Sequence, residues 1–240
     1  MRALAAQTKT EVVLTLRRGE SLLLVLGIPL LLLGFFASVD VLPKGDFRDP
    51  IDLLAPGVLA LAVMSTGMVQ LAIGTAFERQ YGVLKRLGAT PLGRPRLLGA
   101  KTLSILAVEV VQVVLLVGLA LALGWDPSVQ GGAIAAVLLG TVAFAGLGLL
   151  MAGTLRGEVT LAAANGLYLV LLLIGGMVVP LSELPGAVRA VAELLPSAAL
   201  AQALIGTLSA GQSVPGKAWV VLAVWAVVAP AAASRFFRWE

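Results

Sequence analysis

Six long apolar runs constrain the fold of this chain more than any other feature of its sequence. A helix rises about 1.5 Å per residue, so roughly 20 apolar residues are needed to cross the hydrocarbon core of a bilayer. The runs cover residues 21–39, 53–77, 102–125, 131–155, 159–180 and 218–234. Composition agrees, because 59% of the residues are hydrophobic and only 12% are charged. We therefore expect an all-α integral membrane protein with six spans, forming one transmembrane domain over residues 1–240.

The basic residues predict how the six runs are oriented. Four Lys or Arg residues precede the first run, six lie in 77–101, one is Arg156 and two follow Ser234. The alternate loops hold Lys44, Arg48, Arg189 and Lys217 together with most of the acidic residues. The positive-inside rule then places both termini in the cytoplasm. A bias toward Ala, Gly, Val, Leu and Arg favours a bacterial source, and hence the bacterial cytoplasmic membrane.

The composition also excludes several kinds of chemistry. The chain has no Cys and no His, so it offers no disulfide, no thiolate or imidazole metal ligand and no His general base. Residues 211–218, GQSVPGKA, resemble a phosphate-binding loop but end in Ala218, which lacks the hydroxyl that would bind Mg²⁺. The net charge of +4 is explained by topology and anionic lipid headgroups. We expect no catalytic residue, metal site or cofactor on this chain, and no nucleic-acid partner.

The basic segment between the second and third runs has an ordered pattern. An apolar stripe recurs at spacings of four, three and three, formed by Phe77, Tyr81, Leu84 and Leu87. Charged residues lie off this stripe, and Gly88 and Pro91 would end the element. The pattern predicts one short amphipathic helix, which either rests on lipid or offers its surface to a cytoplasmic partner. On the second interpretation, Leu84→Asp or Tyr81→Ala would leave insertion intact and uncouple the partner.

Two segments resemble permeases of the ABC type-2 exporter family. The sequence ERQYGVLKRLGATPL, residues 78–92, resembles the segment that follows the second span in that family. The matching residues are Glu78, Arg79, Gly82, Leu84, Arg86, Leu87, Thr90, Pro91 and Leu92. Gln80 stands where a second Glu is common, which calls into question a salt bridge that this Glu would make. Residues 180–204 resemble the family's outer-face helical hairpin, with Leu195-Pro196 where Asn-Pro is frequent.

The resemblance implies a half-permease that works with other subunits. Residues 1–20 would form an amphipathic elbow helix, for which a basic tail that only sets topology is the alternative. Residues 78–95 would form a coupling region on a separate ATPase subunit, which would bind ATP and Mg²⁺. The coupling residues would be Glu78, Arg79, Tyr81, Leu84, Arg86, Leu87, Thr90 and Pro91. Two ATPase subunits would join two permease subunits, either two copies of this chain or this chain with a relative.

A few polar residues lie inside the apolar runs. Glu109 is the only acidic one, and a charge at the membrane centre costs about 2.5 to 3.5 kcal/mol on insertion scales. Gln112 lies one turn further on, Gln70 is in the preceding run and Asn165 in the fifth. Gln70, Glu109 and Gln112 could form one polar strip. These four residues either line a substrate path or make hydrogen bonds between helices.

The family resemblance implies export of a small hydrophobic or amphipathic molecule, such as a drug, an antibiotic or a lipid-like compound. The predicted outer loops are short, which favours such a cargo over a peptide. Two alternatives from other classes are a proton-coupled transporter or channel that uses Glu109, and a lipid-modifying membrane enzyme. The enzyme would need clustered carboxylates or a His near a headgroup, and the acidic cluster in residues 40–52 has no His beside it.

Overall fold

A computed structural model describes residues 2–17, 19–39, 49–88, 93–128 and 131–238. These described residues are mostly helical and contain no strand, which confirms the all-α prediction. The helices are α1 Arg2–Arg17, α2 Gly19–Ser38, α3 Pro50–Met64, η1 Ser65–Gln70, α4 Leu71–Gln80, α5 Val83–Gly88, α6 Arg94–Ala122, α7 Ala133–Thr154, α8 Gly157–Ile174, η2 Leu181–Glu183, α9 Gly186–Ala192, α10 Pro196–Leu208 and α11 Gly216–Phe236.

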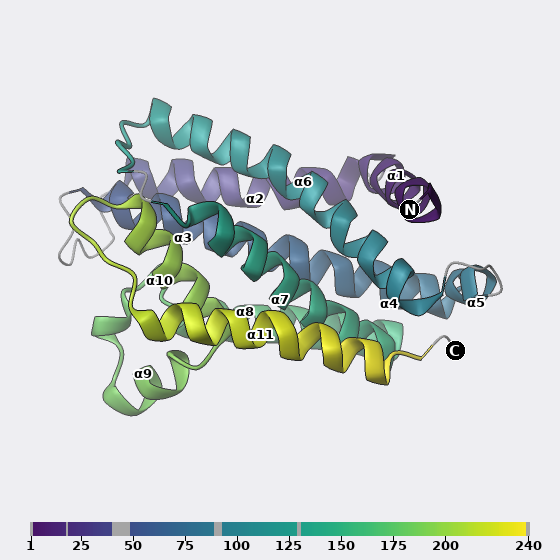
Figure 1. Cartoon of the computed structure of the whole chain (residues 1–240). Helices are drawn as coiled ribbons and strands as arrows, with labels where there is room; N and C mark the ends of the chain where they lie inside the picture. Colours follow the sequence, from purple (N-terminus) through teal and green to yellow (C-terminus); the bar gives the residue numbers. More distant parts are fainter. Residues whose placement is uncertain (1, 18, 40–48, 89–92, 129–130, 239–240) are drawn as a thin grey trace.

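Long apolar helices lie side by side in one bundle (Figure 1). Among the described residues, five are long and apolar enough to cross a membrane. They are Pro50–Gln80, which joins α3, η1 and α4, and the apolar parts of α6, α7, α8 and α11. The count rises to six if α9 and α10, which meet at 86°, form one broken span. Helix α2, in which Val25–Ser38 is apolar, also belongs to this bundle.

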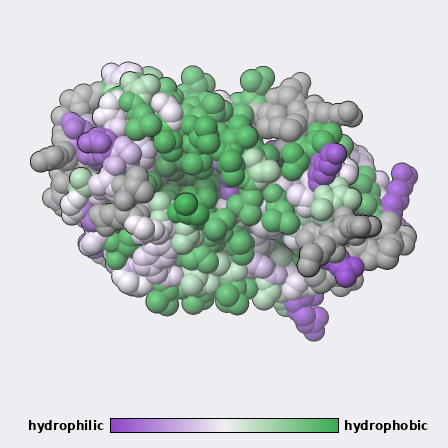
Figure 2. Space-filling view, turned by 45° about the horizontal axis from the view of Figure 1, so that its top comes forward, coloured by the Kyte–Doolittle hydropathy of each residue, from purple (hydrophilic) through white to green (hydrophobic). Residues whose placement is uncertain are grey.

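The two ends of the bundle differ in what they carry. One end holds α1, α5 and the C-terminal end of α11, and the other holds α9 and the loop between α10 and α11 (Figure 1). We call the first the basic end, because Arg79, Lys101 and Arg156 lie there. Apolar side chains form a broad band across the middle of the molecule, with hydrophilic residues toward both ends (Figure 2). This distribution matches the layering of a bilayer.

The core is built around α3. Every residue from Leu53 to Met64 is buried, because α2, α6, α7 and α10 pack around this helix. The sequence predicts a hairpin on the outer face over residues 180–204. In the structure most of residues 182–191, including α9, lie at the surface, whereas α10 returns into the bundle and is buried against α3, α7 and α11. The small residues of α10, such as Ala198 and Ala201, permit this close packing.

Two glycines let neighbouring helices approach α7 closely. A Cβ atom on Gly146 would lie 2.5 Å from the backbone nitrogen of Pro230 in α11. A Cβ atom on Gly148 would lie 2.7 Å from the carbonyl oxygen of Met68 in η1. Both contacts are shorter than any side chain allows, so only glycine fits. The glycines of α7 therefore let α11 pack closely on one side and η1, the centre of the span Pro50–Gln80, on the other.

A π-helical turn interrupts the long span Pro50–Gln80. Residues Ser65–Gln70 form η1 between α3 and α4, and one extra residue per turn there rotates the side chains that follow. Met68, whose carbonyl oxygen lies against Gly148 of α7, belongs to this turn. Turns of this kind are frequent at functional sites. Three residues of this turn, Ser65, Val69 and Gln70, line one cavity, which is described in the next subsection.

The predicted short helix that ends at Gly88 is present as α5, but the stripe from Phe77 to Leu87 is not one continuous helix, so that part of the prediction is wrong. The amide of Gly82 donates to the carbonyl of Arg79 at 3.0 Å, which ends α4 in a tight turn. Gly82 has φ of 71°, a left-handed conformation that interrupts the helix and favours glycine. A second short helix, α5, then begins at Val83. Thr90 and Pro91 lie outside the described residues.

Candidate functional site

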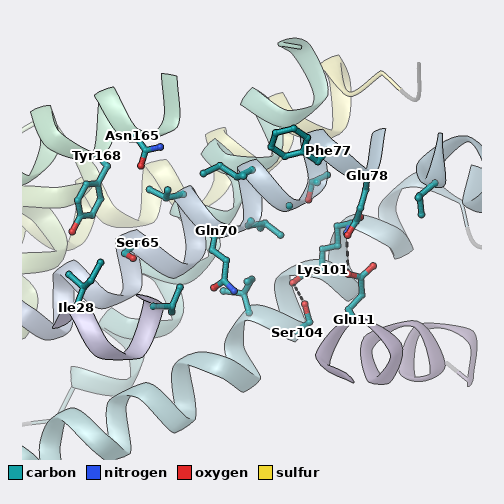
Figure 3. A pocket seen from close by; sticks show the side chains of 18 of the residues that line it. Glu11, Ile28, Ser65, Gln70, Phe77, Glu78, Lys101, Ser104, Asn165 and Tyr168 are labelled. Carbon is teal, nitrogen blue, oxygen red and sulfur yellow. Dashed lines mark hydrogen bonds and ion pairs between the residues drawn. The ribbon is translucent and has the colours of Figure 1, made fainter. Parts of the chain in front are cut away.

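A cavity of about 640 Å³ opens among α2, η1, α4, α6 and α8 (Figure 3). Its wall on α2 is apolar and includes Val25 and Ile28. Its end nearest the basic end of the bundle is polar, with Glu11, Glu78 and Lys101. The cavity thus has one apolar flank and one polar end, which is the arrangement that an amphipathic molecule would fill.

Polar groups reach the middle of the cavity from two sides. Ser65 and Gln70 come from η1, and Asn165 and Tyr168 come from α8 (Figure 3). The Oε1 atom of Gln70 is buried and has no hydrogen-bond partner among the described residues. Asn165 donates from Nδ2 to the carbonyl of Leu161 in its own helix at 2.9 Å. A bound molecule with a hydrogen-bond donor would satisfy Gln70.

A buried ion cluster closes the polar end of the cavity. The Lys101 side chain is 2% exposed, and its Nζ lies 3.1 Å from Oε2 of Glu11 and 2.5 Å from Oε2 of Glu78. Gln7 donates to the other oxygen of Glu11 at 2.9 Å. Lys101 in α6 therefore joins α1 to the end of α4, and these three side chains point toward one another (Figure 3).

This cluster was missed by reasoning from the sequence, although signals for it exist. Glu11 is the only acidic residue of α1, which otherwise carries basic and apolar residues. Lys101 is the last basic residue before the third apolar run. A lone charge of each sign at the edge of an apolar segment favours pairing, because burial of either one alone is costly. Glu78 precedes α5 and Lys101 follows it, so their ion pair holds together the two ends of the segment that contains α5.

The apolar stripe of the 78–95 segment does not form one exposed face. Leu84 is fully buried in a cluster with Leu97 and Leu98 of α6, and Leu87 packs against the same cluster. Tyr81 is 72% exposed, and its ring stacks on Phe77 with centroids 6.2 Å apart. The interpretation of Leu84 as a contact surface is therefore wrong for this chain. A short helix that must pack on α6 turns its leucines inward.

The charged residues of the same segment have different surroundings. Arg79 donates from Nη2 to the carbonyl oxygen of Leu155, between α7 and α8. Arg86 is exposed on α5. Of the predicted coupling residues that the structure describes, Tyr81 and Arg86 are exposed, whereas Glu78 and Arg79 tie the segment to the bundle.

The four polar residues predicted inside the spans separate into two groups. Gln70 and Asn165 line the cavity, whereas Glu109 and Gln112 do not. Gln112 accepts from Thr66 at 3.0 Å and donates to the carbonyl of Val25 at 2.7 Å, and Glu109 accepts from Thr141. Glu109 and Gln112 thus connect α6 to α2, η1 and α7 inside the bundle. The single polar strip that would include Gln70 is not formed.

Comparison with known proteins identifies the family of the chain. A family model described as ABC-2 type transporter matches residues 2–208. No curated protein matches the chain. The family match covers most of the 240 residues, including the ion cluster, the cavity and the 78–95 segment. The chain therefore belongs to the ABC-2 type transporter family, whose membrane domains are transport subunits and not catalytic ones.

Proposed function

We propose that this chain is the permease subunit of an ATP-driven exporter that carries a small hydrophobic or amphipathic molecule out of a bacterial cell. The basic end would face the cytoplasm, as the distribution of Lys and Arg favours. A separate ATPase subunit would bind ATP and Mg²⁺ and would contact α5. Two permease subunits and two ATPase subunits would form the working unit. The observation that carries this proposal is the cavity whose polar end adjoins the segment containing α5.

The cavity supports an amphipathic cargo for two reasons. Val25 and Ile28 provide an apolar wall on the side formed by α2, and Ile28 is 47% exposed, so the wall continues to the outer surface of the bundle. Gln70 supplies a buried acceptor at the centre. A hydrophobic molecule with one hydrogen-bonding group could enter from the bilayer and place that group against Gln70.

The ion cluster supports a mechanical connection between ATPase contact and cavity. Glu78 and Lys101 line the cavity and also bracket the segment that contains α5. A displacement of α5 by an ATPase subunit would therefore shift α4 and α6, which form two walls of the cavity. Tyr81 and Arg86 are exposed at this end and would contact the ATPase.

Copurification tests the subunit assignment. The tagged chain would be expressed from its own locus in the organism that encodes it and purified in mild detergent. We expect an ATP-binding subunit in stoichiometric amount, and we expect Tyr81→Ala to remove it. Phe236→Ala is the matched control, because Phe236 is also an exposed aromatic residue at the basic end. A chain that purifies without an ATPase would contradict the proposal and favour a proton-coupled transporter.

The cargo assignment needs a different measurement. Amphipathic compounds would be added to the reconstituted complex, and stimulation of ATP hydrolysis would be recorded for each. Gln70→Leu removes the central acceptor, so we expect a higher concentration of the stimulating compound to be required. Gln212→Leu, in the loop before α11 and outside the cavity, is the control. Equal responses of the two variants would show that the cavity does not bind the stimulating compound.

A further inference from the structure

A second cavity, of about 460 Å³, lies at the basic end between the last turn of α4 and the first turn of α8. It is separate from the cavity described above, and none of the described residues lines both. Among the described residues that line it, three are basic, Arg79, Lys85 and Arg156, and one is acidic, Glu158. Its positive charge suits an anion.

The guanidinium of Arg79 is held in place and incompletely satisfied. Its Nη2 donates to the carbonyl oxygen of Leu155, whereas its buried Nη1 has no hydrogen-bond partner among the described residues. The charge of Arg238 lies close enough to repel that of Arg79. Arg238 is held near this site because its amide donates to the carbonyl of Gly153 at 3.1 Å. An anion in the cavity, beside the guanidinium of Arg79, would offset this accumulation of positive charge.

The start of α8 adds to the positive potential of the cavity. Gly157 is the first residue of α8 and lines the cavity, and the side chain of the N-cap residue, Arg156, makes no capping hydrogen bond. The first amides of a helix and the positive end of its dipole attract anions. Two sources of positive charge, the side chains and the helix end, therefore meet at one point.

The position of the cavity in the bundle identifies the source of the anion. Arg79 lies in the last turn of the long span Pro50–Gln80, and Arg156 lies between the spans α7 and α8, so the cavity is at the depth of lipid headgroups. Leu161 and Ala162 follow Glu158 by one helical turn on α8 and are exposed. An acyl chain could lie along this apolar surface while its headgroup occupies the cavity.

We propose that this cavity binds the phosphate headgroup of an anionic phospholipid. Arg79, Arg156 and the first turn of α8 would contact the phosphate, and the exposed apolar surface of α8 would contact an acyl chain. Basic pockets between membrane helices are suited to such headgroups. An acidic side chain of an ATPase fits less well, because α5 extends further from the bundle than the ends of α4 and α8 do (Figure 1). The inference does not depend on ATP-driven transport.

Lipid binding to the purified chain tests this proposal. The full chain would be delipidated in a neutral detergent, and binding of phosphatidylglycerol and phosphatidylcholine would be measured by native mass spectrometry. We expect saturable binding of phosphatidylglycerol and little binding of phosphatidylcholine. Arg156→Gln should weaken binding of phosphatidylglycerol about fivefold, the effect of one basic residue close to an anionic lipid. Arg235→Gln, also exposed at the basic end but outside the cavity, should change it by less than about twofold.

Three outcomes would overturn the proposal. Equal weakening by Arg156→Gln and Arg235→Gln would indicate diffuse attraction to a basic surface. Equal binding of the two lipids would exclude recognition of negative charge. Displacement of phosphatidylglycerol by millimolar inorganic phosphate would indicate a site for a free anion. Arg156 is exposed, so its variant should fold, and its thermal midpoint without lipid checks this. Lys85→Gln provides a second variant of a lining residue if Arg156→Gln does not fold.

Discussion

Lys101 and Lys217 both form ion pairs with glutamates, but their surroundings differ. Lys101 is 2% exposed and lies between two carboxylates where three helices meet. The side chain of Lys217 is 52% exposed and pairs with Glu193 at 3.0 Å at the opposite end of the molecule. A buried pair is costly to break because the remaining charge stays out of water, whereas an exposed pair contributes little. The two lysines therefore provide a matched comparison.

We predict that Lys101→Met destabilises the protein strongly. Glu11 and Glu78 would lose the cation that they share while remaining largely buried. Loss of one partner from a buried pair costs about 3 to 5 kcal/mol. Thermal unfolding in detergent, followed by tryptophan fluorescence, should show a midpoint roughly 10 °C lower. Lys217→Met should shift the midpoint by no more than about 2 °C.

A double variant that keeps the net charge of the cluster separates charge from packing. In Lys101→Met combined with Glu78→Gln, one of the two carboxylates is removed together with the lysine. If the cost arises from unbalanced charge, this variant should be more stable than Lys101→Met alone. A double variant that is no more stable would assign the role of Lys101 to packing.

Gln70 and Gln112 show what the sequence can and cannot predict at the scale of residues. Both lie in long apolar runs, so a place within the membrane follows from hydropathy alone. Gln112 bonds to Thr66 inside the bundle, whereas Gln70 faces the cavity. The π-helical turn at residues 65–70 alters the face that Gln70 presents, and a regular 3.6-residue period does not predict it. Partners on distant helices decide the rest.

At the scale of elements, the close packing of α7 depends on glycine. The contact between α7 and α11 leaves no room for a Cβ atom at Gly146. Run lengths in the sequence indicate both helices, yet they do not indicate which glycine meets which neighbour. That pairing depends on how the helices rotate against one another when the bundle forms.

We predict that Gly146→Ala separates α7 from α11 and destabilises the bundle by about 1 to 3 kcal/mol, the usual cost of overpacking. The backbone of Pro230 would be 2.5 Å from the new methyl group, and a backbone cannot rotate away as a side chain can. Gly166→Ala in α8 is the control, since no atom of the described part of the chain lies within 4 Å of its Cβ position. A Gly146→Ala protein with the thermal midpoint of the control would contradict this packing.

At α5 the sequence shows the helical period of the apolar stripe, but it does not show that the stripe packs against this chain itself. The spacing of Tyr81, Leu84 and Leu87 indicates helical periodicity, yet periodicity alone does not say whether a stripe meets a partner subunit or the chain itself. In the structure Leu84 packs on α6, in one buried cluster with Leu97 and Leu98. The turn at Gly82 then leaves Tyr81 outside this cluster.

We predict a large loss of stability for one substitution in this segment and almost no change for another. Leu84→Ala should cost about 2 to 5 kcal/mol of stability, because it opens a space in a buried cluster. Tyr81→Ala should change stability by less than about 0.5 kcal/mol, since the side chain is 72% exposed. Thermal unfolding of the chain purified alone distinguishes them. If both variants unfolded at the wild-type temperature, α5 would not be packed on α6.

At the scale of the whole molecule, the separation of charge between the two ends connects the fold to its orientation. The hydropathy runs predict the long helices because burial of apolar surface depends on length and composition alone. The broken pair α9 and α10 was not predicted as part of the core, because a 13-residue helix is too short to be recognised as a span. The basic residues predict an orientation in the membrane, and this orientation can be measured directly.

We predict that the basic end faces the cytoplasm, and cysteine labelling tests this. The chain has no Cys, so single cysteines report without background. Thr154 at the end of α7 and Ser213 in the loop before α11 are both exposed and lie at opposite ends of the bundle, because α7 and α11 run parallel with Gly153 beside Phe237. A membrane-impermeant maleimide should label Ser213→Cys in intact spheroplasts and Thr154→Cys only after permeabilisation. The reverse pattern would place the segment containing α5 outside the cell, where no ATP-binding subunit could reach Tyr81.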